Sequence, residues 1–184
     1  MPMKADLWFP TVIWNDHLKD VNNTEIKEYV EKLAEEDKVG KVASNYGGWQ
    51  SKSFELLDQK PLAIERFIHT LQRCLNECTK MAGMPDLIIS DWWWNINYHK
   101  DYNQPHNHRD SVLSGVYYID VPEDSDSKIH FDREDEAQYY LPRYMPQRNQ
   151  ITAVRATYTP LNNNVLIFPS WVIHYVDGNK SQKP

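Results

Sequence analysis

The chain has 184 residues, of which 41% are hydrophobic and 25% are charged, and this length and composition fit one globular domain with a sizeable core. Its net charge of -6 disfavours nucleic acid or an anionic membrane surface as a partner. The sequence has no apolar run near the roughly 20 residues of a membrane span and no N-terminal signal-peptide pattern, so we expect a cytoplasmic protein.

The first half of the chain predicts two helices. One begins at Asn23-Thr24, with Asn23 as the N-cap, because the apolar residues that follow recur at helical spacing. These residues are Ile26, Tyr29, Val30 and Leu33. The other helix begins at Pro61 and ends at Gly83, since glycine tolerates the left-handed conformation that closes a helix. Its Cys74 and Cys78 fit a buried helix face of a cytoplasmic protein better than a disulfide framework.

After Pro85 the pattern changes to short strands separated by turn-rich stretches. The predicted strands are 87–90, 112–121, 129–131, 151–158, 165–168 and 171–176. Helices followed by strands predict an α+β, mainly β fold, in which a β-sandwich or barrel carries the N-terminal helices on one face. We therefore expect a single domain of residues 1–184, with a helical part at 1–85 and a β core at 86–184.

Two features of the strand-rich half have alternative interpretations. The segment 132–150 is long and charged, so it predicts either a lid over a site or a surface insertion. The aromatic residues around Trp92-Trp93-Trp94 and Tyr117-Tyr118 suit the wall of a ligand cavity, but they would equally fill the core of a twisted sheet.

A His-x-Asp pair, His108 and Asp110, is followed far downstream by His174. Residues i and i+2 of an extended strand point to the same face, about 6–7 Å apart, so this pair can bind one ion and a distant strand can add the third ligand. Two histidines and one carboxylate are the ligand set of mononuclear non-haem Fe(II) oxygenases. His106 has the same spacing from His108, and it is the alternative ligand. With His106 the set could also bind zinc, although no general base stands beside it.

Several longer motifs resemble a known enzyme family. They are Trp94-Asn95-Ile96-Asn97, Pro105-His106-Asn107-His108, Ser114-Gly115-Val116-Tyr117-Tyr118 and Phe168-Pro169-Ser170-Trp171, with His174 after the last. Leu7-Trp8-Phe9-Pro10-Thr11 and Gly48-Trp49-Gln50-Ser51 extend the resemblance into the first half. The sequence thus resembles the 2-oxoglutarate-dependent Fe(II) oxygenases of bacteria and their phages over most of its length. This resemblance implies a double-stranded β-helix, or jelly-roll, core.

The resemblance also implies roles for single residues. His108, Asp110 and His174 would be the catalytic iron ligands, with Fe(II) and 2-oxoglutarate as cofactors. The carboxylate is the least constrained of the three, and His106 is again its alternative. A carboxylate completes the charge and geometry of the facial triad, which favours Asp110.

Other residues would bind the co-substrate. Tyr98 and Tyr118 occupy positions from which a phenol hydroxyl reaches 2-oxoglutarate, and Lys183 is the cation that follows the distal histidine. The family's own Arg would come just after Pro184, followed by one more strand, so we expect a jelly-roll core that lacks its last strand. The sheet edge left open would favour pairing of two chains into a homodimer.

Together these implications predict a 2-oxoglutarate/Fe(II)-dependent dioxygenase that acts as a hydroxylase. It would use O2, and its substrate would be a small molecule or a protein side chain. Two other classes share the same residues. A cupin-like jelly roll would bind metal without 2-oxoglutarate chemistry. A non-catalytic relative would share the fold but would have lost catalytic activity. The metal content of the protein and its response to 2-oxoglutarate distinguish these three classes.

Overall fold

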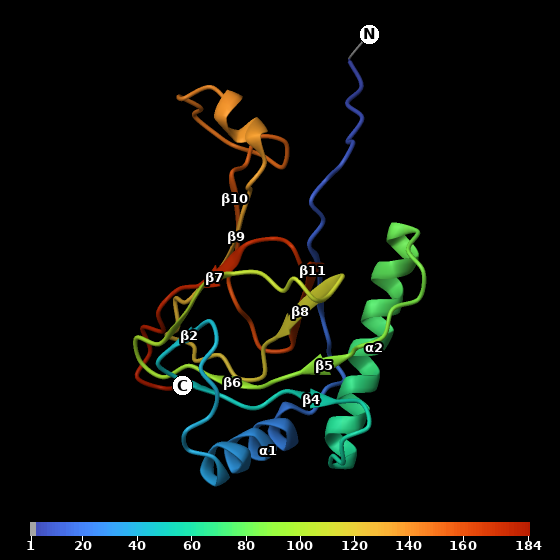
Figure 1. The fold of residues 1–184 in the computed structure, drawn as a ribbon. Coiled ribbons are helices and arrows are strands. Elements are labelled where there is room, and N and C mark those ends of the chain that lie inside the picture. The colour runs from blue at the N-terminus through green and yellow to red at the C-terminus, as the bar shows by residue number, and fades with distance from the viewer. Residues whose placement is uncertain (1–2) are drawn as a thin grey trace.

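The computed structural model describes residues 3–184, in which two α-helices precede most of the strands (Figure 1). The helices are α1 (Asn23–Glu36) and α2 (Leu62–Ala82). The longer strands are β1 (Trp14–His17), β7 (Tyr102–His106), β8 (Leu113–Tyr117), β9 (Ile129–Asp132), β10 (Arg155–Tyr158), β11 (Asn164–Pro169) and β12 (His174–Val176). The two-residue strands are β2 (Asn45–Tyr46), β3 (Trp49–Gln50), β4 (Phe54–Glu55), β5 (Asp91–Trp92) and β6 (Asn95–Ile96). A 3-10 helix, η1 (Glu136–Tyr140), lies between β9 and β10.

The N-cap of α1 is Asn22, one residue before the predicted Asn23. The Asn22 side chain accepts a hydrogen bond from the Thr24 backbone N–H at 3.2 Å, which satisfies one of the free donors of the first turn. Asn23 instead ties the helix to the β core, because its side chain donates to the Ile119 carbonyl at 2.6 Å and accepts from the Tyr117 hydroxyl at 2.7 Å. The prediction of Asn23 as cap was therefore wrong by one position, since Asn23 is engaged in a long-range contact.

The second predicted helix is confirmed at both ends. α2 begins directly after Pro61, and Gly83 closes it in the left-handed conformation with φ 64°. Its two cysteines are free, Cys78 is buried, and Cys74 is half-buried. Burial raises the pKa of both thiols, that of Cys78 to about 11.

The strand predicted at 87–90 is absent from the described structure of residues 3–184. The backbone of this segment instead forms hydrogen bonds with the Gln72 side chain of α2. That side chain accepts from the Ile89 N–H at 2.9 Å and donates to the Leu87 carbonyl at 2.8 Å. Pairing begins only at β5 and β6, which bind β4 and β3. The other predicted strands exist, although those at 112–121, 151–158 and 171–176 are shorter than the sequence indicates.

Two antiparallel sheets form the β core, and the mainly β expectation is confirmed. One has the strand order β10-β9-β12-β7-β2, and the other has the order β1-β11-β8. Ile129 and Phe131 of β9 bury their side chains with Leu166 and Phe168 of β11, so the two sheets pack against each other. The Phe131 and Phe168 rings lie 4.8 Å apart between centroids, in an edge-to-face arrangement.

The helices join the core through a separate buried cluster. It contains Ile26 and Val30 of α1, Ile64, Phe67 and Ile68 of α2, and Trp49, Phe54 and Trp94 from the short-strand region. Each fully buried side chain of this kind stabilises the fold by about 1.5–3 kcal/mol, so the cluster holds both helices against the segment 91–97.

The segment between β9 and β10 projects away from the body of the molecule, as the orange ribbon in Figure 1 shows. Its Tyr139, Tyr140 and Tyr144 side chains are exposed. In residues 3–184, no helix has the length and apolarity that crossing a membrane requires.

Candidate metal centre

Three histidines meet where β7 ends and β12 begins. His106 is the last residue of β7 and His174 is the first of β12, and the antiparallel register places them opposite one another. His108 lies just beyond β7, where its backbone N–H donates to the Ser170 carbonyl at 2.9 Å. The pairing of two strands distant in sequence thus brings the three imidazoles together.

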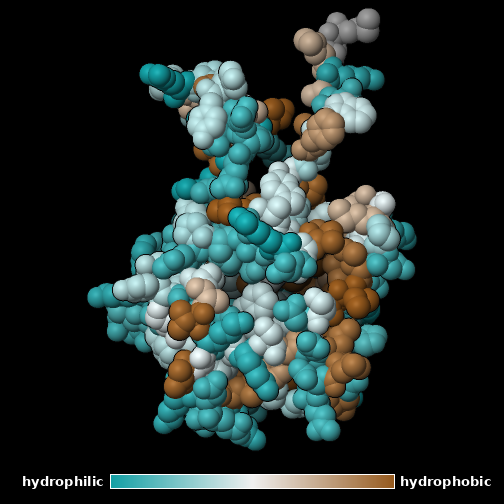
Figure 2. All heavy atoms as spheres, viewed as in Figure 1, coloured by the Kyte–Doolittle hydropathy of each residue, from teal (hydrophilic) through white to brown (hydrophobic). Residues whose placement is uncertain are grey.

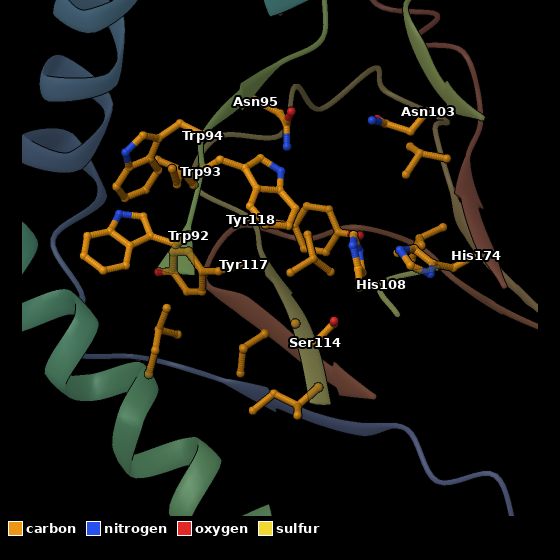
Figure 3. Close-up of a pocket in the computed structure, with 18 of the residues that line it drawn as sticks. Trp92, Trp93, Trp94, Asn95, Asn103, His108, Ser114, Tyr117, Tyr118 and His174 are labelled. Carbon is orange, nitrogen blue, oxygen red and sulfur yellow. The ribbon is translucent and has the colours of Figure 1, made fainter. Parts of the chain in front are cut away.

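The three imidazoles lie close enough to share one ion. Their ring centroids are 4.3 Å apart for His106 and His174, 5.0 Å for His106 and His108, and 5.1 Å for His108 and His174. One ligand nitrogen from each lies within 4.8 Å of the other two. Figure 3 shows His108 and His174 facing each other across a short gap. Imidazole nitrogens in this arrangement can bind a first-row divalent metal such as iron or zinc.

Hydrogen bonds fix the ring tautomer of two of these histidines. The Nδ1 of His106 lies 2.7 Å from the Gln104 carbonyl, and the Nδ1 of His174 lies 3.0 Å from the Val172 carbonyl. A carbonyl can only accept, so each Nδ1 carries the proton and donates it. The Nε2 atoms then keep their lone pairs free, which is the state in which histidine binds a metal.

Burial lowers the pKa of all three histidines, that of His174 to about 4. They are therefore neutral at pH 7, and three adjacent imidazoles meet without charge repulsion. Phe131 and Phe168 contribute to this burial, because their rings lie 5.9 Å and 4.7 Å from that of His174. The Trp93 ring lies 5.5 Å from that of His108.

Ser170 holds the two halves of the cluster together. It is fully buried, and its hydroxyl lies 2.7 Å from that of Ser114 on β8. Its backbone carbonyl accepts from His108, and its N–H donates to the Val112 carbonyl at 3.0 Å. The loop that carries His108 is therefore fastened to the turn that precedes His174.

His106 and His108 line two cavities, and His174 lines the larger of them. The larger has a volume of about 1000 Å3 and extends from the three histidines to the tryptophans 92–94 and α2 (Figure 3). The smaller, of about 490 Å3, is lined by His106 and His108 together with polar side chains that include Lys41 and Gln104. A molecule could therefore approach the cluster from either side.

Comparison with known proteins identifies the family. A family model described as "Putative 2OG-Fe(II) oxygenase" matches residues 91–184, which is half of the chain and contains all three histidines. The chain belongs to the 2-oxoglutarate-dependent Fe(II) oxygenases. Fe(II) and 2-oxoglutarate are the cofactors that this family uses, and the neutral imidazole cluster fits an Fe(II) ion.

A solved structure shares the fold of this oxygenase. The crystal structure of a Pseudomonas putida prolyl-4-hydroxylase superposes with a TM-score of 0.64 at 11% sequence identity. The match covers 92% of this chain and 86% of that chain. The comparison with curated proteins finds no match.

Asp110 is not part of the histidine cluster in this oxygenase. It lies exposed in the turn at 109–110, beyond the end of β7, and the group of nearby ligand atoms found among the described residues contains His106 instead. β7 ends at His106, so His108 and Asp110 do not lie together on an extended strand in this structure, and Asp110 as a ligand stays a prediction. Asp110 does line the larger cavity.

The three residues expected to bind the co-substrate lie in different surroundings. Tyr118 lines the larger cavity and points its ring toward His108 in Figure 3. Its buried hydroxyl has no hydrogen-bond partner among the described residues, and burial raises its pKa. Tyr98 is 48% exposed, and Lys183 has an exposed side chain near the C-terminus. Within residues 3–184, neither Tyr98 nor Lys183 belongs to the lining of the two cavities.

The segment 132–150, for which a lid was one of two interpretations, does not line these cavities. Their lining, within the described residues, includes none of the segment 133–150. Of the two interpretations of this segment, the structure therefore supports the surface insertion. The tryptophans show both predicted roles, since Trp94 is buried in the helix cluster and also lines the cavity with Trp92 and Trp93.

The Ser114–Ser170 pair was missed by reasoning from the sequence. Both residues stand in the motifs that carry the family resemblance, Ser114-Gly115-Val116 and Phe168-Pro169-Ser170, so the signal was present. A serine has no periodicity of its own, however, and its contact across two strands depends on the register between β8 and β11.

Proposed function

We propose that this protein is an Fe(II)- and 2-oxoglutarate-dependent hydroxylase whose iron is held by His106, His108 and His174. The observation that carries the proposal is the cluster of three neutral imidazoles, two of them with Nδ1 bound to a carbonyl, in a chain of this family. His106 replaces Asp110 because it is already in place at the end of β7. Binding through Asp110 would require the turn at 109–110 to rearrange.

The bound Fe(II) and 2-oxoglutarate would supply the activation of O2 that oxidises a C–H bond of the substrate. The chain's own residues would hold the imidazole ligands in position and keep water away from them. The carbonyls of Gln104 and Val172 hold two imidazoles in the tautomer that leaves Nε2 free. Phe131 and Phe168 exclude water from the back of His174.

Tyr118 is the residue that we propose contacts the co-substrate. Its hydroxyl is buried beside the cluster and has no partner among residues 3–184, and a buried donor of this kind costs about 1–3 kcal/mol unless something accepts from it. A carboxylate or keto oxygen of 2-oxoglutarate would accept that hydrogen bond. Tyr98 and Lys183 would contribute only if the cavity were shaped differently when the co-substrate is bound.

We further propose that the two sheets are the halves of a double-stranded β-helix in a single domain, with α1 and α2 packed on one face. The similarity to the prolyl-4-hydroxylase fold and the shared core of β9 and β11 support this architecture. The substrate that we propose is a small molecule or a protein side chain. The polar lining of the smaller cavity suits a polar group near His106 and His108.

Anaerobic titration of the metal-free protein with Fe(II) and then 2-oxoglutarate tests this function. Chelation of 2-oxoglutarate to bound iron is expected to produce a visible metal-to-ligand charge-transfer band, and His174→Ala should abolish it. Asp110→Ala is the matched control, because its exposed side chain can be removed without disturbing the core. Stoichiometric metal without a band would instead favour a cupin-like metal-binding protein, and absence of metal would favour a non-catalytic relative.

A further inference from the structure

Two cavities reach the histidine cluster, and they leave room for two different molecules. Tyr118, the proposed contact of the co-substrate, lines only the larger cavity. The smaller cavity has a volume of about 490 Å3, the size of a small-molecule site, and its walls come from within the segments 41–53, 91–93 and 104–108. Pro184, the last residue of the sequence, lines only the larger cavity, so no wall of the smaller one comes from the end of the chain.

Lys41 carries the only positive charge in the described lining of the smaller cavity. Its backbone N–H donates to the Gln50 carbonyl at 2.8 Å, which holds this residue against β3. The close approach requires Gly40, which has φ 61° and where a Cβ atom would lie 2.6 Å from the same carbonyl oxygen. The Lys41 ammonium group forms no ion pair with a carboxylate of residues 3–184. A fastened loop thus brings an unpaired cation to the cavity.

The Gln50 side chain is buried in the wall of the same cavity. Only 5% of Gln50 is exposed, and its backbone pairs with that of Asn95 between β3 and β6. Within the described part of the chain, its side-chain amide forms no hydrogen bond, although leaving a buried amide without a partner is costly. A ligand in the cavity would satisfy this amide, since its N–H groups donate to an oxygen acceptor such as a carboxylate.

Asp91 supplies a charge of the opposite sign. It is the only carboxylate in the described lining of the smaller cavity, and no cation of residues 3–184 forms an ion pair with it. Its Oδ1 accepts a hydrogen bond from the Ser90 hydroxyl at 2.9 Å, which leaves Oδ2 available to a ligand. Two residues later, the Trp93 ring lies 5.5 Å from that of His108, so this segment runs beside the histidine cluster.

We propose that the smaller cavity binds the substrate and that this substrate is a small zwitterion, a free amino acid. Lys41 and the Gln50 amide bind its carboxylate, and Asp91 binds its ammonium group. Hydrogen bonds that involve charged groups are the strong ones, so two opposite charges in one cavity select a molecule that carries both. This inference rests on the proposed hydroxylase function, in which His106 and His108 place the iron beside the same cavity.

The surroundings of the cavity favour a free amino acid over a residue within a protein. A residue inside a polypeptide has no charge on its backbone, because its amino and carboxyl groups form peptide bonds. Contiguous apolar patches mark surfaces that bind proteins. Around β2 and β6, Figure 2 shows hydrophobic residues only in small groups among hydrophilic ones, whereas a larger hydrophobic patch follows α2. The visible surface beside the cavity therefore suits a small molecule.

Anaerobic calorimetric titration of the protein with Fe(II) and 2-oxoglutarate present measures substrate binding without turnover. The probes are the free L-amino acids except glutamate, which resembles 2-oxoglutarate. We expect at least one of them to bind, and its N-acetyl and its amide derivative should each bind on the order of tenfold or more weakly, because each has lost one charge. If no free amino acid binds, or if the N-acetyl amides bind more tightly than the free amino acids, the proposal is overturned.

The charge-transfer band in the same samples separates this inference from the proposed function. A protein that shows the band but binds no amino acid would overturn the zwitterion site and leave the hydroxylase function in place. Binding of an amino acid without a band would support the zwitterion site and overturn the hydroxylase function.

Substitutions assign the two charges of the ligand to their partners. Lys41→Met should weaken binding of the free amino acid about as much as amidation does, with no further effect on the amide. Asp91→Asn should do the same in relation to the N-acetyl derivative. Lys38→Met, an exposed lysine of the same loop outside both cavities, is the matched control and should change nothing. Equal losses for the amino acid and its amide in Lys41→Met, or a loss of affinity for 2-oxoglutarate alone, would overturn the proposal.

Discussion

At the scale of single residues, the composition of the histidine cluster depends on where a strand ends. β7 stops at His106, so the next residues turn away and Asp110 becomes exposed while His106 stays opposite His174. The His-x-His and His-x-Asp patterns have the same spacing and differ only in which residue lies on the strand. Their distinction therefore depends on the pairing of β7 with β12.

Removing His106 should weaken metal binding far more than removing Asp110. His106→Ala takes away one of three imidazoles, and we expect the affinity for Fe(II) or Co(II) to fall by more than about a hundredfold, since loss of a mere hydrogen-bond partner of a ligand already costs about 10–100-fold. Asp110→Ala should leave the affinity within a few-fold of the original. Anaerobic calorimetric titration measures both, and the reverse ranking would restore Asp110 as the ligand.

Tyr117 should make the fold sensitive to alkaline pH. Burial raises the pKa of Tyr117 from its usual value of 10.0 to about 12, so above pH 10 the unfolded chain loses this proton before the folded one does. The unfolded state then binds fewer protons, and the free energy of unfolding declines as pH rises from about 10 toward 12. In urea unfolding, the stability advantage of the original protein over Tyr117→Phe should shrink in this range. An advantage that is constant from pH 8 to pH 11 would contradict the assignment.

At the scale of secondary-structure elements, the helices are more predictable than the strands. The stripe of α2 and its Gly83 cap are local features, and both ends of the helix were correctly predicted. The segment 87–90 has a strand-like composition, yet the Gln72 side chain binds its backbone groups and prevents pairing. A side chain from an element distant in sequence has no local signature.

Truncating the buried stripe of α2 should destabilise the protein strongly. Ile64 is 1% exposed in the cluster that joins both helices to the core, and Ile64→Ala should lower the free energy of unfolding by about 2–5 kcal/mol. Arg66, on the exposed face of the same helix, is the control, and Arg66→Ala should stay within about 0.5 kcal/mol. Urea denaturation of the two variants gives the comparison. Equal effects would mean that the packing of α2 is not as described.

At the scale of the whole molecule, the projecting segment between β9 and β10, which carries η1, is separate from the histidine cluster. Arg133 N–H donates to the Val154 carbonyl at 2.9 Å, so the pairing of β9 with β10 extends beyond the ends of both strands. A tight turn placed after this pair could therefore join the two strands. Replacement of 135–152 by Asn-Gly, which favours a tight hairpin turn, should leave metal affinity and the charge-transfer band unchanged. Loss of metal binding in a folded variant would show that the projection acts at the site.

The sequence by itself indicated a mainly β domain through its helix and strand patterns, and it indicated the class of the protein through the motifs that resemble a known family. It also named every histidine of the cluster, with His106 as the alternative to Asp110. The tertiary structure decided which of these side chains meet and whether 132–150 lines the cavities beside them. The physical reason is that antiparallel pairing joins residues far apart in sequence, and a shift of one residue in register turns every side chain to the opposite face.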